Sequence, residues 1–281
     1  MKIIISPAKK LDFDSSLPEN IEKIFRSSKK SDPLKKDREE LLKWIPKDKS
    51  SLKKLMHLSD SLADLNAKRY SNWQSAKTCP AIFAFRGDVY KGLDVTSLSK
   101  DALVRLQENL LILSGLYGVL RPFDEIKPHR LEMGTKLKTP AGQTLYDFWQ
   151  GKIANQISKQ LTEKEIIVNL ASKEYFLSVA EEFAKKSIKV ITPVFLDRVK
   201  NSKNKYATIG LFAKRARGMM TRFIIEKKVN TPNALENFNS EGYIFSHWGK
   251  ASEKSAAGKA EGKLGKNFQN HDEQFIVFQR D

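Results

Sequence analysis

Hydrophobic and polar positions alternate along the chain with two different periods, which predicts both strands and helices. Runs that are wholly or mostly apolar, typical of buried strands, lie at residues 3–5, 81–85, 110–113, 166–171, 189–196, 205–212 and 275–278. Apolar positions spaced three and four apart, the helix period, lie at residues 51–73, 102–110, 145–157 and 213–229, and another helix is predicted to start at Ser172. The polar stretch 15–50 predicts peripheral helices. The sequence therefore predicts an α/β (mixed α+β) fold, in which a mixed sheet is flanked by helices.

Residues 213–229 show the clearest periodicity of the chain. At about 100° per residue, one apolar arc is formed by Ala216, Met219, Met220, Phe223 and Ile224. Gly218 lies inside this predicted helix, where glycine costs about 1 kcal/mol relative to alanine. A glycine retained at such a position predicts the close approach of a backbone or a ligand.

The polar surface of the same helix is strongly basic. Lys214 and Arg217 lie on one side of this surface, and Arg215 and Arg222 lie on the other. Basic groups near a helix N-terminus oppose the macrodipole, so helix stability does not explain them. Arginine forks suit phosphate oxygens, which favours an anion-binding face over the alternative of a merely solvated face.

Residues 113–134 form a long irregular segment directly after the predicted strand 110–113. Pro122 and Pro128 exclude a regular helix or strand there. The segment carries two arginines and three carboxylates, at Arg121, Asp124, Glu125, Arg130 and Glu132. Charged groups at the carboxyl end of a buried strand favour a binding site, and the alternative is a structural Ω-loop whose charges satisfy one another.

The overall charge narrows the class of partner. The chain of 281 residues carries a formal net charge of +17, which favours an anionic partner. Nucleic acid is the leading candidate, ahead of an acidic membrane surface and a phosphorylated metabolite, and the alternative is a lysine-rich protein without such a partner.

Other features of the sequence indicate where the protein is located and how many domains it has. One cysteine excludes an internal disulfide, and no segment resembles a signal peptide or a membrane span, so we expect a soluble, cytoplasmic protein without membrane contact. Residues 1–281 are predicted to form one domain. The stretch at about 247–270 is rich in glycine and lysine and predicts a flexible basic excursion.

Carboxylates are the only candidate catalytic groups that the sequence offers. The four histidines and Cys79 show no metal-ligand spacing, and nucleotide-binding fingerprints are absent, so neither a metal nor another cofactor is expected. Asp124, Glu132 and Glu174 are candidate general acids or bases on a nucleobase, nucleotide or DNA strand. The alternative is that they orient arginines through ion pairs.

Several runs resemble the YaaA family of peroxide-stress proteins. They are residues 5–9 (Ile-Ser-Pro-Ala-Lys), 85–93 (Phe-Arg-Gly-Asp-Val-Tyr-Lys-Gly-Leu), 113–122, 130–134 (Arg-Leu-Glu-Met-Gly), 169–175, 213–225 and 238–243. The resemblance is collinear from residue 1 to about 245, and the chain departs from the pattern beyond it.

The resemblance implies a single compact domain of the type described as a cantaloupe fold, with a basic cleft and a helix-hairpin-helix. We place the helix-hairpin-helix at residues 52–70, with 103–121 as the alternative; without the resemblance, 51–73 is a simple pair of helices. The implied partner is duplex, bubbled or branched DNA, bound without strong sequence specificity. The implied biological setting is the response to hydrogen peroxide, in which the family is linked to limiting intracellular iron. The expected DNA contacts are Lys9, Arg86, Arg121, Arg130, Lys214, Arg215, Arg217 and Arg222. The rival functions are an enzyme using the carboxylates above and, more weakly, a small-ligand or iron-linked sensor.

Overall fold

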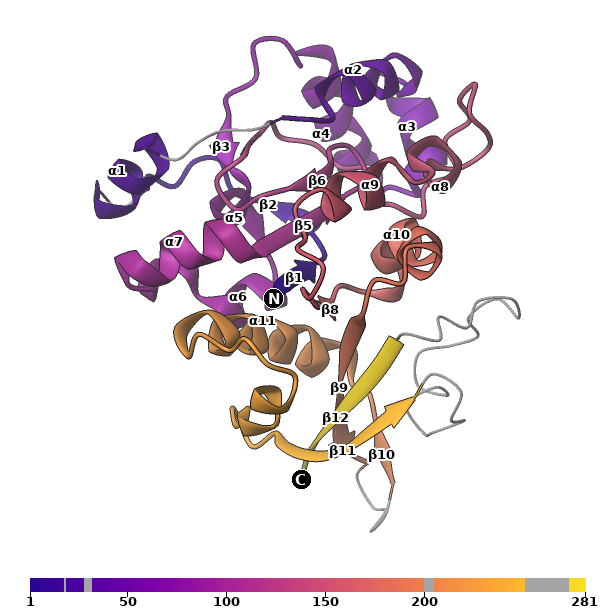
Figure 1. Cartoon of the computed structure of the whole chain (residues 1–281). Helices are drawn as coiled ribbons and strands as arrows, with labels where there is room; N and C mark the ends of the chain where they lie inside the picture. Colours follow the sequence, from indigo (N-terminus) through magenta and orange to yellow (C-terminus); the bar gives the residue numbers. More distant parts are fainter. Residues whose placement is uncertain (18, 28–31, 200–204, 251–272) are drawn as a thin grey trace.

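The computed structural model of the chain describes residues 1–17, 19–27, 32–199, 205–250 and 273–281 (Figure 1). The predicted excursion lies for the most part outside these residues. Its first four residues, 247–250, belong to strand β11 (Ile244–Lys250), so the predicted start of the excursion was wrong.

An eight-stranded mixed sheet forms the centre of the molecule, which confirms the predicted fold class. Its five central strands are mutually parallel, and the other three pair antiparallel with them. The parallel strands, in spatial order, are β12 (Glu273–Arg280), β9 (Val190–Arg198), β8 (Ile167–Leu170), β1 (Lys2–Ile5) and β5 (Leu110–Ser114). The antiparallel strands are β11, β6 (Gly118–Leu120) and β10 (Tyr206–Ala207).

Strand β1 lies where the strand order reverses direction. Ile3 pairs with Leu110 of β5 on one side and with Val168 of β8 on the other. The chain therefore runs from β1 outward to β5 and later returns to the opposite side of β1. In open parallel sheets, ligands bind outside the carboxyl ends of the strands at such a reversal.

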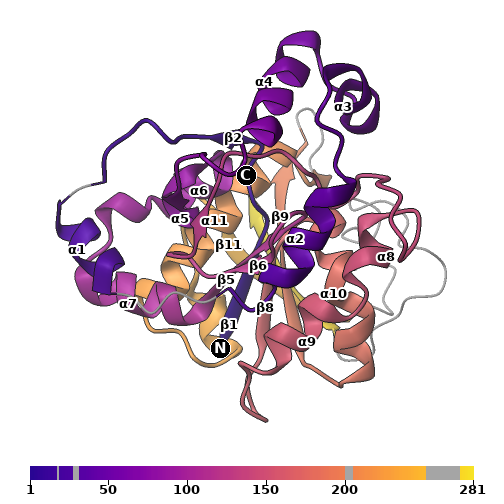
Figure 2. The same cartoon turned by 90° about the horizontal axis from the view of Figure 1, so that it is seen from above.

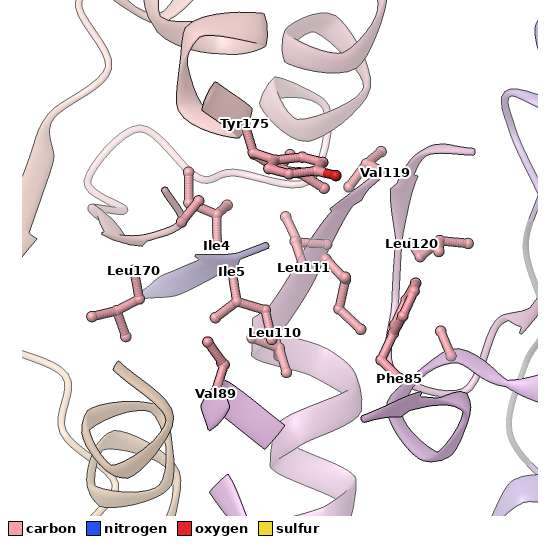
Figure 3. Close-up of a cluster of buried hydrophobic side chains, with 14 of the residues drawn as sticks. Ile4, Ile5, Phe85, Val89, Leu110, Leu111, Val119, Leu120, Leu170 and Tyr175 are labelled. Carbon is pink, nitrogen blue, oxygen red and sulfur yellow. The ribbon is translucent and has the colours of Figure 1, made fainter. Parts of the chain in front are cut away.

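Helices cover both faces of the sheet (Figure 2). One face is covered by α6 (Asp88–Leu93), α7 (Lys100–Asn109) and α11 (Gly210–Glu226). The other face is covered by α8 (Leu145–Trp149), α9 (Lys152–Ser158) and α10 (Lys173–Lys185). Figure 3 shows the resulting core, with Val89 of α6 and Tyr175 of α10 on opposite sides of β1.

Smaller elements surround these layers. Helices α2 (Lys35–Trp44), α3 (Lys49–Met56) and α4 (Asp60–Ser71) lie toward one end of the molecule, and α3 packs against α4. Helix α1 (Glu19–Ser27) lies apart from them, beside α7. Two short antiparallel pairs bring distant segments together. They are β2 (Lys10–Leu11) with β4 (Phe85–Arg86), and β3 (Cys79–Pro80) with β7 (Glu125–Ile126).

Three predicted elements were wrong. Residues 81–84 form the buried helix α5 (Ala81–Ala84) instead of a strand, because a short apolar run without a period fits either structure. The helix predicted at 145–157 is two helices, since Gly151 has a left-handed φ of 71°. The strand predicted at 205–212 ends at Ala207, and helix α11 begins at Gly210 with Leu211 and Phe212 exposed.

Helices α6 and α11 cross at two glycines, which confirms the close approach predicted at Gly218. A Cβ on Gly218 would lie 1.9 Å from the Val89 carbonyl oxygen, and one on Gly92 would lie 2.1 Å from the Arg215 carbonyl oxygen. The approaching group is therefore the backbone of α6. This crossing fixes the first turn of α6 relative to the basic helix.

Candidate functional site

A cavity of about 490 Å³ opens at the carboxyl ends of β8, β1 and β5, where the strand order reverses. Ser6 follows β1, Ser114 ends β5, and Ser172 follows β8, and all three line the cavity. The first turn of α6 and the N-terminal half of α11 close it from one side. The sheet topology thus brings segments that are distant in the sequence to one site.

Five of the eight cations expected to contact DNA line this cavity. They come from the loop after β1, from β4, from the segment after β7, and from α11, and they are Lys9, Arg86, Arg130, Lys214 and Arg217. On α11, the cavity lies on the side that the helical pattern assigned to Lys214 and Arg217.

Glu132 lies between two of these cations. Its carboxylate is 2.6 Å from Lys9 Nζ and 2.9 Å from the terminal nitrogen of Arg130. Burial raises the pKa of Glu132, but the hydrogen bonds from Lys9 and Arg130 outweigh it and leave the pKa below its usual value. Glu132 is therefore ionised at neutral pH and fixes the position of both cations.

Arg86 is positioned by a second carboxylate. Its Nε and terminal nitrogen donate to Asp12 Oδ2 at 3.1 and 3.0 Å. Hydrogen bonds from Ser15, together with those from Arg86, hold the pKa of Asp12 well below its usual value. The antiparallel pairing of β2 with β4 brings Asp12 to Arg86.

A hydrogen-bond network ties the ends of β1 and β8 together. The Ser172 amide donates to Ser6 Oγ at 2.8 Å, and Ser6 Oγ donates to Ser172 Oγ at 3.2 Å. The Tyr90 hydroxyl donates to the Ser6 carbonyl at 3.1 Å. These bonds connect the start of α10, the loop after β1 and the start of α6 around the cavity.

Glu174 also lines the cavity and is engaged by the backbone. Its Oε1 accepts from the Gly134 amide at 2.9 Å, which joins α10 to the segment that carries Arg130 and Glu132. The carboxylate thus links two walls of the site.

The inner part of the cavity is apolar and aromatic. Phe85, Tyr90, Leu170 and Tyr175 are buried there, and burial raises the pKa of both tyrosines well above the usual value. His129 is 6% exposed, and burial lowers the pKa of its imidazole from 6.5 to about 4. These three rings are therefore uncharged at neutral pH.

Comparison with known proteins identifies the family. Residues 1–248 match the family described as peroxide stress protein YaaA. The chain belongs to this family. It is 42% identical to a UPF0246 protein of Hahella chejuensis over 255 residues, which cover 87% of this chain and 94% of the relative. It is 44% identical to a UPF0246 protein of Aliivibrio fischeri (strain MJ11) over 255 residues, with 87% and 93% covered. A UPF0246 protein of Shewanella baltica (strain OS223) is 45% identical over 254 residues, with 88% and 94% covered.

The match to the YaaA family includes every residue of the cavity. The other expected DNA contacts lie elsewhere on the chain. Arg121 lies 3.6 Å from Asp124 in a turn that Asp124 closes by accepting from the Arg121 amide. Neither residue lines the cavity, so Asp124 is not grouped there with Glu132 and Glu174.

Arg222 and Arg215 project from α11 outside the cavity. Arg222 donates to the Leu93 and Asp94 carbonyls at 3.2 and 3.0 Å, which satisfies backbone oxygens at the end of α6. Arg215 Nε donates to Glu241 at 2.6 Å. Arg222 therefore connects α11 to the C-terminal end of α6.

The first expected helix-hairpin-helix segment, residues 52–70, does not line the cavity, and of the alternative segment, residues 103–121, only Ser114 does. Helices α3 and α4 form a short antiparallel pair, with His57 left-handed and the Ser59 side chain capping α4. Residues 103–121 contain part of α7 followed by β5 and β6, so the alternative placement was wrong. Residues 49–71 form the two short helices with a tight connection that the apolar spacing predicts, and the assignment of residues 52–70 as a helix-hairpin-helix stays a prediction.

Several residues of the site were not singled out from the sequence, namely the cavity residues Ser6, Ser172, Tyr90, His129 and Tyr175, and Asp12, which pairs with Arg86. Ser6 and Ser172 each follow a strand that had been predicted, and their position at strand ends was the available signal. The tyrosines and the histidine are scattered along the chain, and only the fold brings them together.

In the part of the chain that the structure describes, no three His, Cys, Asp or Glu side chains are grouped so that they could hold a metal ion. Among the same residues, no helix combines the length and apolar character required to cross a membrane.

Proposed function

We propose that the cavity and its cationic rim bind the phosphate backbone of DNA, and that this binding serves the response to peroxide. The observation that carries the proposal is the convergence of Lys9, Arg86, Arg130, Lys214 and Arg217 on one cavity. These residues come from four separate segments, so their proximity is a product of the fold.

The charge of the site supports an anionic ligand. Six cationic and three carboxylate side chains line the cavity, within a chain of net charge +17. A concave surface of one sign concentrates the field and raises association rates with an oppositely charged polymer. Phosphate contacts by lysine and arginine position a protein on DNA without specifying sequence. We therefore propose binding to duplex, bubbled or branched DNA without strong sequence preference.

The carboxylates favour binding over catalysis. Glu132 is ionised between Lys9 and Arg130, and Glu174 accepts from the Gly134 amide. Both geometries are those of groups that position their neighbours. An enzymatic role for these residues therefore gains no specific support from the geometry.

In its biological setting, we propose that DNA binding limits damage while intracellular iron is restricted. The family match supports the peroxide setting, and the basic cavity supports the DNA component. A strain in which Lys214→Ala and Arg217→Ala replace the native residues should then lose survival under hydrogen peroxide.

The test is the salt dependence of DNA binding by fluorescence anisotropy with a labelled duplex. On B-DNA, log K falls with log salt by about 0.9 for each phosphate neutralised. Lys214→Ala with Arg217→Ala should reduce the magnitude of this slope by about 1.8. A wild-type affinity that does not change with salt would contradict the proposal.

The matched control is Lys185→Ala with Lys186→Ala. These lysines are exposed at the C-terminal end of α10. Their substitution removes two positive charges, as Lys214→Ala with Arg217→Ala does. Because α10 begins at the cavity and rises about 1.5 Å per residue, its far end lies roughly 20 Å away. The control should leave the slope unchanged.

A further inference from the structure

The size of the cavity restricts what can enter it. A volume of about 490 Å³ lies within the range of small-molecule sites, roughly 300–1,000 Å³. A cube of that volume has an edge of roughly 8 Å, while the major groove of a DNA duplex alone is about 12 Å wide. A duplex can lie against the rim, but only a group of the size of one nucleotide fits inside.

The rim of the cavity carries charged side chains, whereas its floor is apolar. Lys9 and Arg86 on the rim have side chains that are 64% and 38% exposed, and Lys214 is exposed as well. The floor is made of buried Phe85, Leu170 and Tyr175, with side chains from both faces of the sheet. A ligand with an anionic end and a flat, largely apolar end matches this division.

The floor suits a heteroaromatic ring better than an aliphatic chain. The Phe85 and Tyr90 ring centroids are 5.6 Å apart, and His129 lies 6.4 Å from Phe85 with its ring nearly perpendicular. His129 Nδ1 lies 2.7 Å from the Lys127 carbonyl oxygen, which can only accept, so Nδ1 carries the proton and Nε2 is left as an acceptor. Aromatic faces stack on nucleobases, and a ring acceptor can receive a base amino or imino group.

We infer that the cavity takes one nucleoside 5′-monophosphate unit, with the base in the aromatic floor and the phosphate at the rim formed by Lys9, Arg86, Lys214 and Arg217. The inference rests on the proposed function, because a bound DNA strand supplies the nucleotide. One nucleotide of that strand leaves the base stack and enters the cavity. A free mononucleotide has the same chemistry, and the experiment separates the two sources.

The first arm compares two labelled duplexes of equal length by anisotropy, one fully paired and one with a single extrahelical nucleotide. The bulged duplex has already lost the pairing and stacking that extrusion would break. The wild-type protein should bind it about 5- to 150-fold more tightly, the range given by stacking one base on aromatic side chains. Equal affinities for the two duplexes would overturn the inference and leave the proposed function standing.

The second arm closes the cavity without changing its charge. Ala8 is half-buried in the lining, 3.2 Å from the position that a Cβ on Gly87 would occupy, so Ala8→Phe adds a ring to this wall. The variant should lose the preference, so that it binds the bulged and the paired duplex with equal affinity within about twofold. A preference that survives in this variant would overturn the inference.

The third arm uses the wild-type protein and distinguishes a nucleotide supplied by DNA from a free mononucleotide. Thymidine 5′-monophosphate and 2′-deoxyadenosine 5′-monophosphate are tested by saturation-transfer NMR and as competitors. At saturation they should abolish the preference for the bulged duplex while the paired duplex stays bound. Mononucleotide binding without binding to either duplex would support a free nucleotide as the ligand and overturn the proposed function. Binding of neither mononucleotides nor DNA would overturn both.

Discussion

At the scale of single residues, the fold determines which groups of the site are ionised and which are neutral. Glu132 and Asp12 are kept ionised beside arginines, while His129, Tyr90 and Tyr175 are kept neutral by burial. The sequence identified the cations and Glu132 but did not show which partner each would have. Arg86 illustrates the difficulty, because its partner Asp12 is 74 residues away and reaches it through the pairing of β2 with β4.

His129 predicts a pH dependence of stability. The folded pKa, about 4, is lower than the ordinary value of 6.5, so the unfolded chain takes up a proton in this range and the folded chain does not. The free energy of unfolding should therefore fall as the pH is lowered from about 6.5 to about 4, by about 3 kcal/mol from this group.

The measurement is urea denaturation of the wild type and His129→Gln between pH 7.5 and 5. The difference in unfolding free energy between the two proteins should shrink as the pH falls, because glutamine does not titrate. Parallel pH profiles would show that His129 does not carry this dependence.

Cys79 predicts that the peroxide response does not depend on thiol oxidation. It is the only cysteine of the chain, and burial raises the pKa of its thiol to about 11. At pH 7 only about one molecule in 10,000 then carries the thiolate, which is the species that reacts with peroxide.

Dimedone labelling followed by mass spectrometry of protein treated with hydrogen peroxide should detect no sulfenic acid at this residue. Cys79→Ser should retain the DNA affinity of the wild type after the same treatment. Rapid, stoichiometric labelling of Cys79 would refute the prediction.

At the scale of elements, periodicity predicted the long helices and the central strands but not the short elements. Helix α11 and strands β1 and β5 have one clear period or a continuous apolar run, and their sequences determine them locally. Helix α5 has only four residues, and its identity is set by contacts with residues 122–124, whose carbonyls accept from Ala81 and Ile82. Sequence pattern cannot supply such long-range contacts.

The crossing of α6 and α11 predicts a strong effect of Gly218→Ala. The added methyl group would lie 1.9 Å from the Val89 carbonyl oxygen, so the helices must separate. Overpacking of this kind costs about 1–3 kcal/mol or more, and thermal denaturation should show a correspondingly lower midpoint.

Gly210→Ala on the same helix is the matched control. A Cβ at Gly210 meets nothing within 4 Å, and alanine is the better helix former. The control should melt at the wild-type temperature or slightly above it. Equal destabilisation by both substitutions would contradict the close crossing.

At the scale of the whole molecule, the reversal of strand order at β1 explains why the site could be only partly predicted. The segments that carry Lys9, Arg130 and Ser172 were each recognisable as strand ends or loops, and parallel pairing brings them to one edge. The order of the strands was not available from the pattern. For that reason Arg121, which follows β5 and β6 on the outer side of the sheet, was grouped with the cavity cations although it lies apart from them.

The most direct test of the DNA-binding proposal compares Arg217→Ala with Arg215→Ala. The two arginines lie on the same helix and differ by about 200° around its axis, and only Arg217 lines the cavity. Each substitution removes one positive charge, so the chain's net charge changes equally. The measured quantity is the slope of log K against log salt for a labelled duplex.

Arg217→Ala should lower the magnitude of the slope by about 0.9 and weaken binding, while Arg215→Ala should leave both at the wild-type value. Equal losses in the two variants would mean that overall charge and not the cavity attracts DNA, and the proposed site would then be wrong.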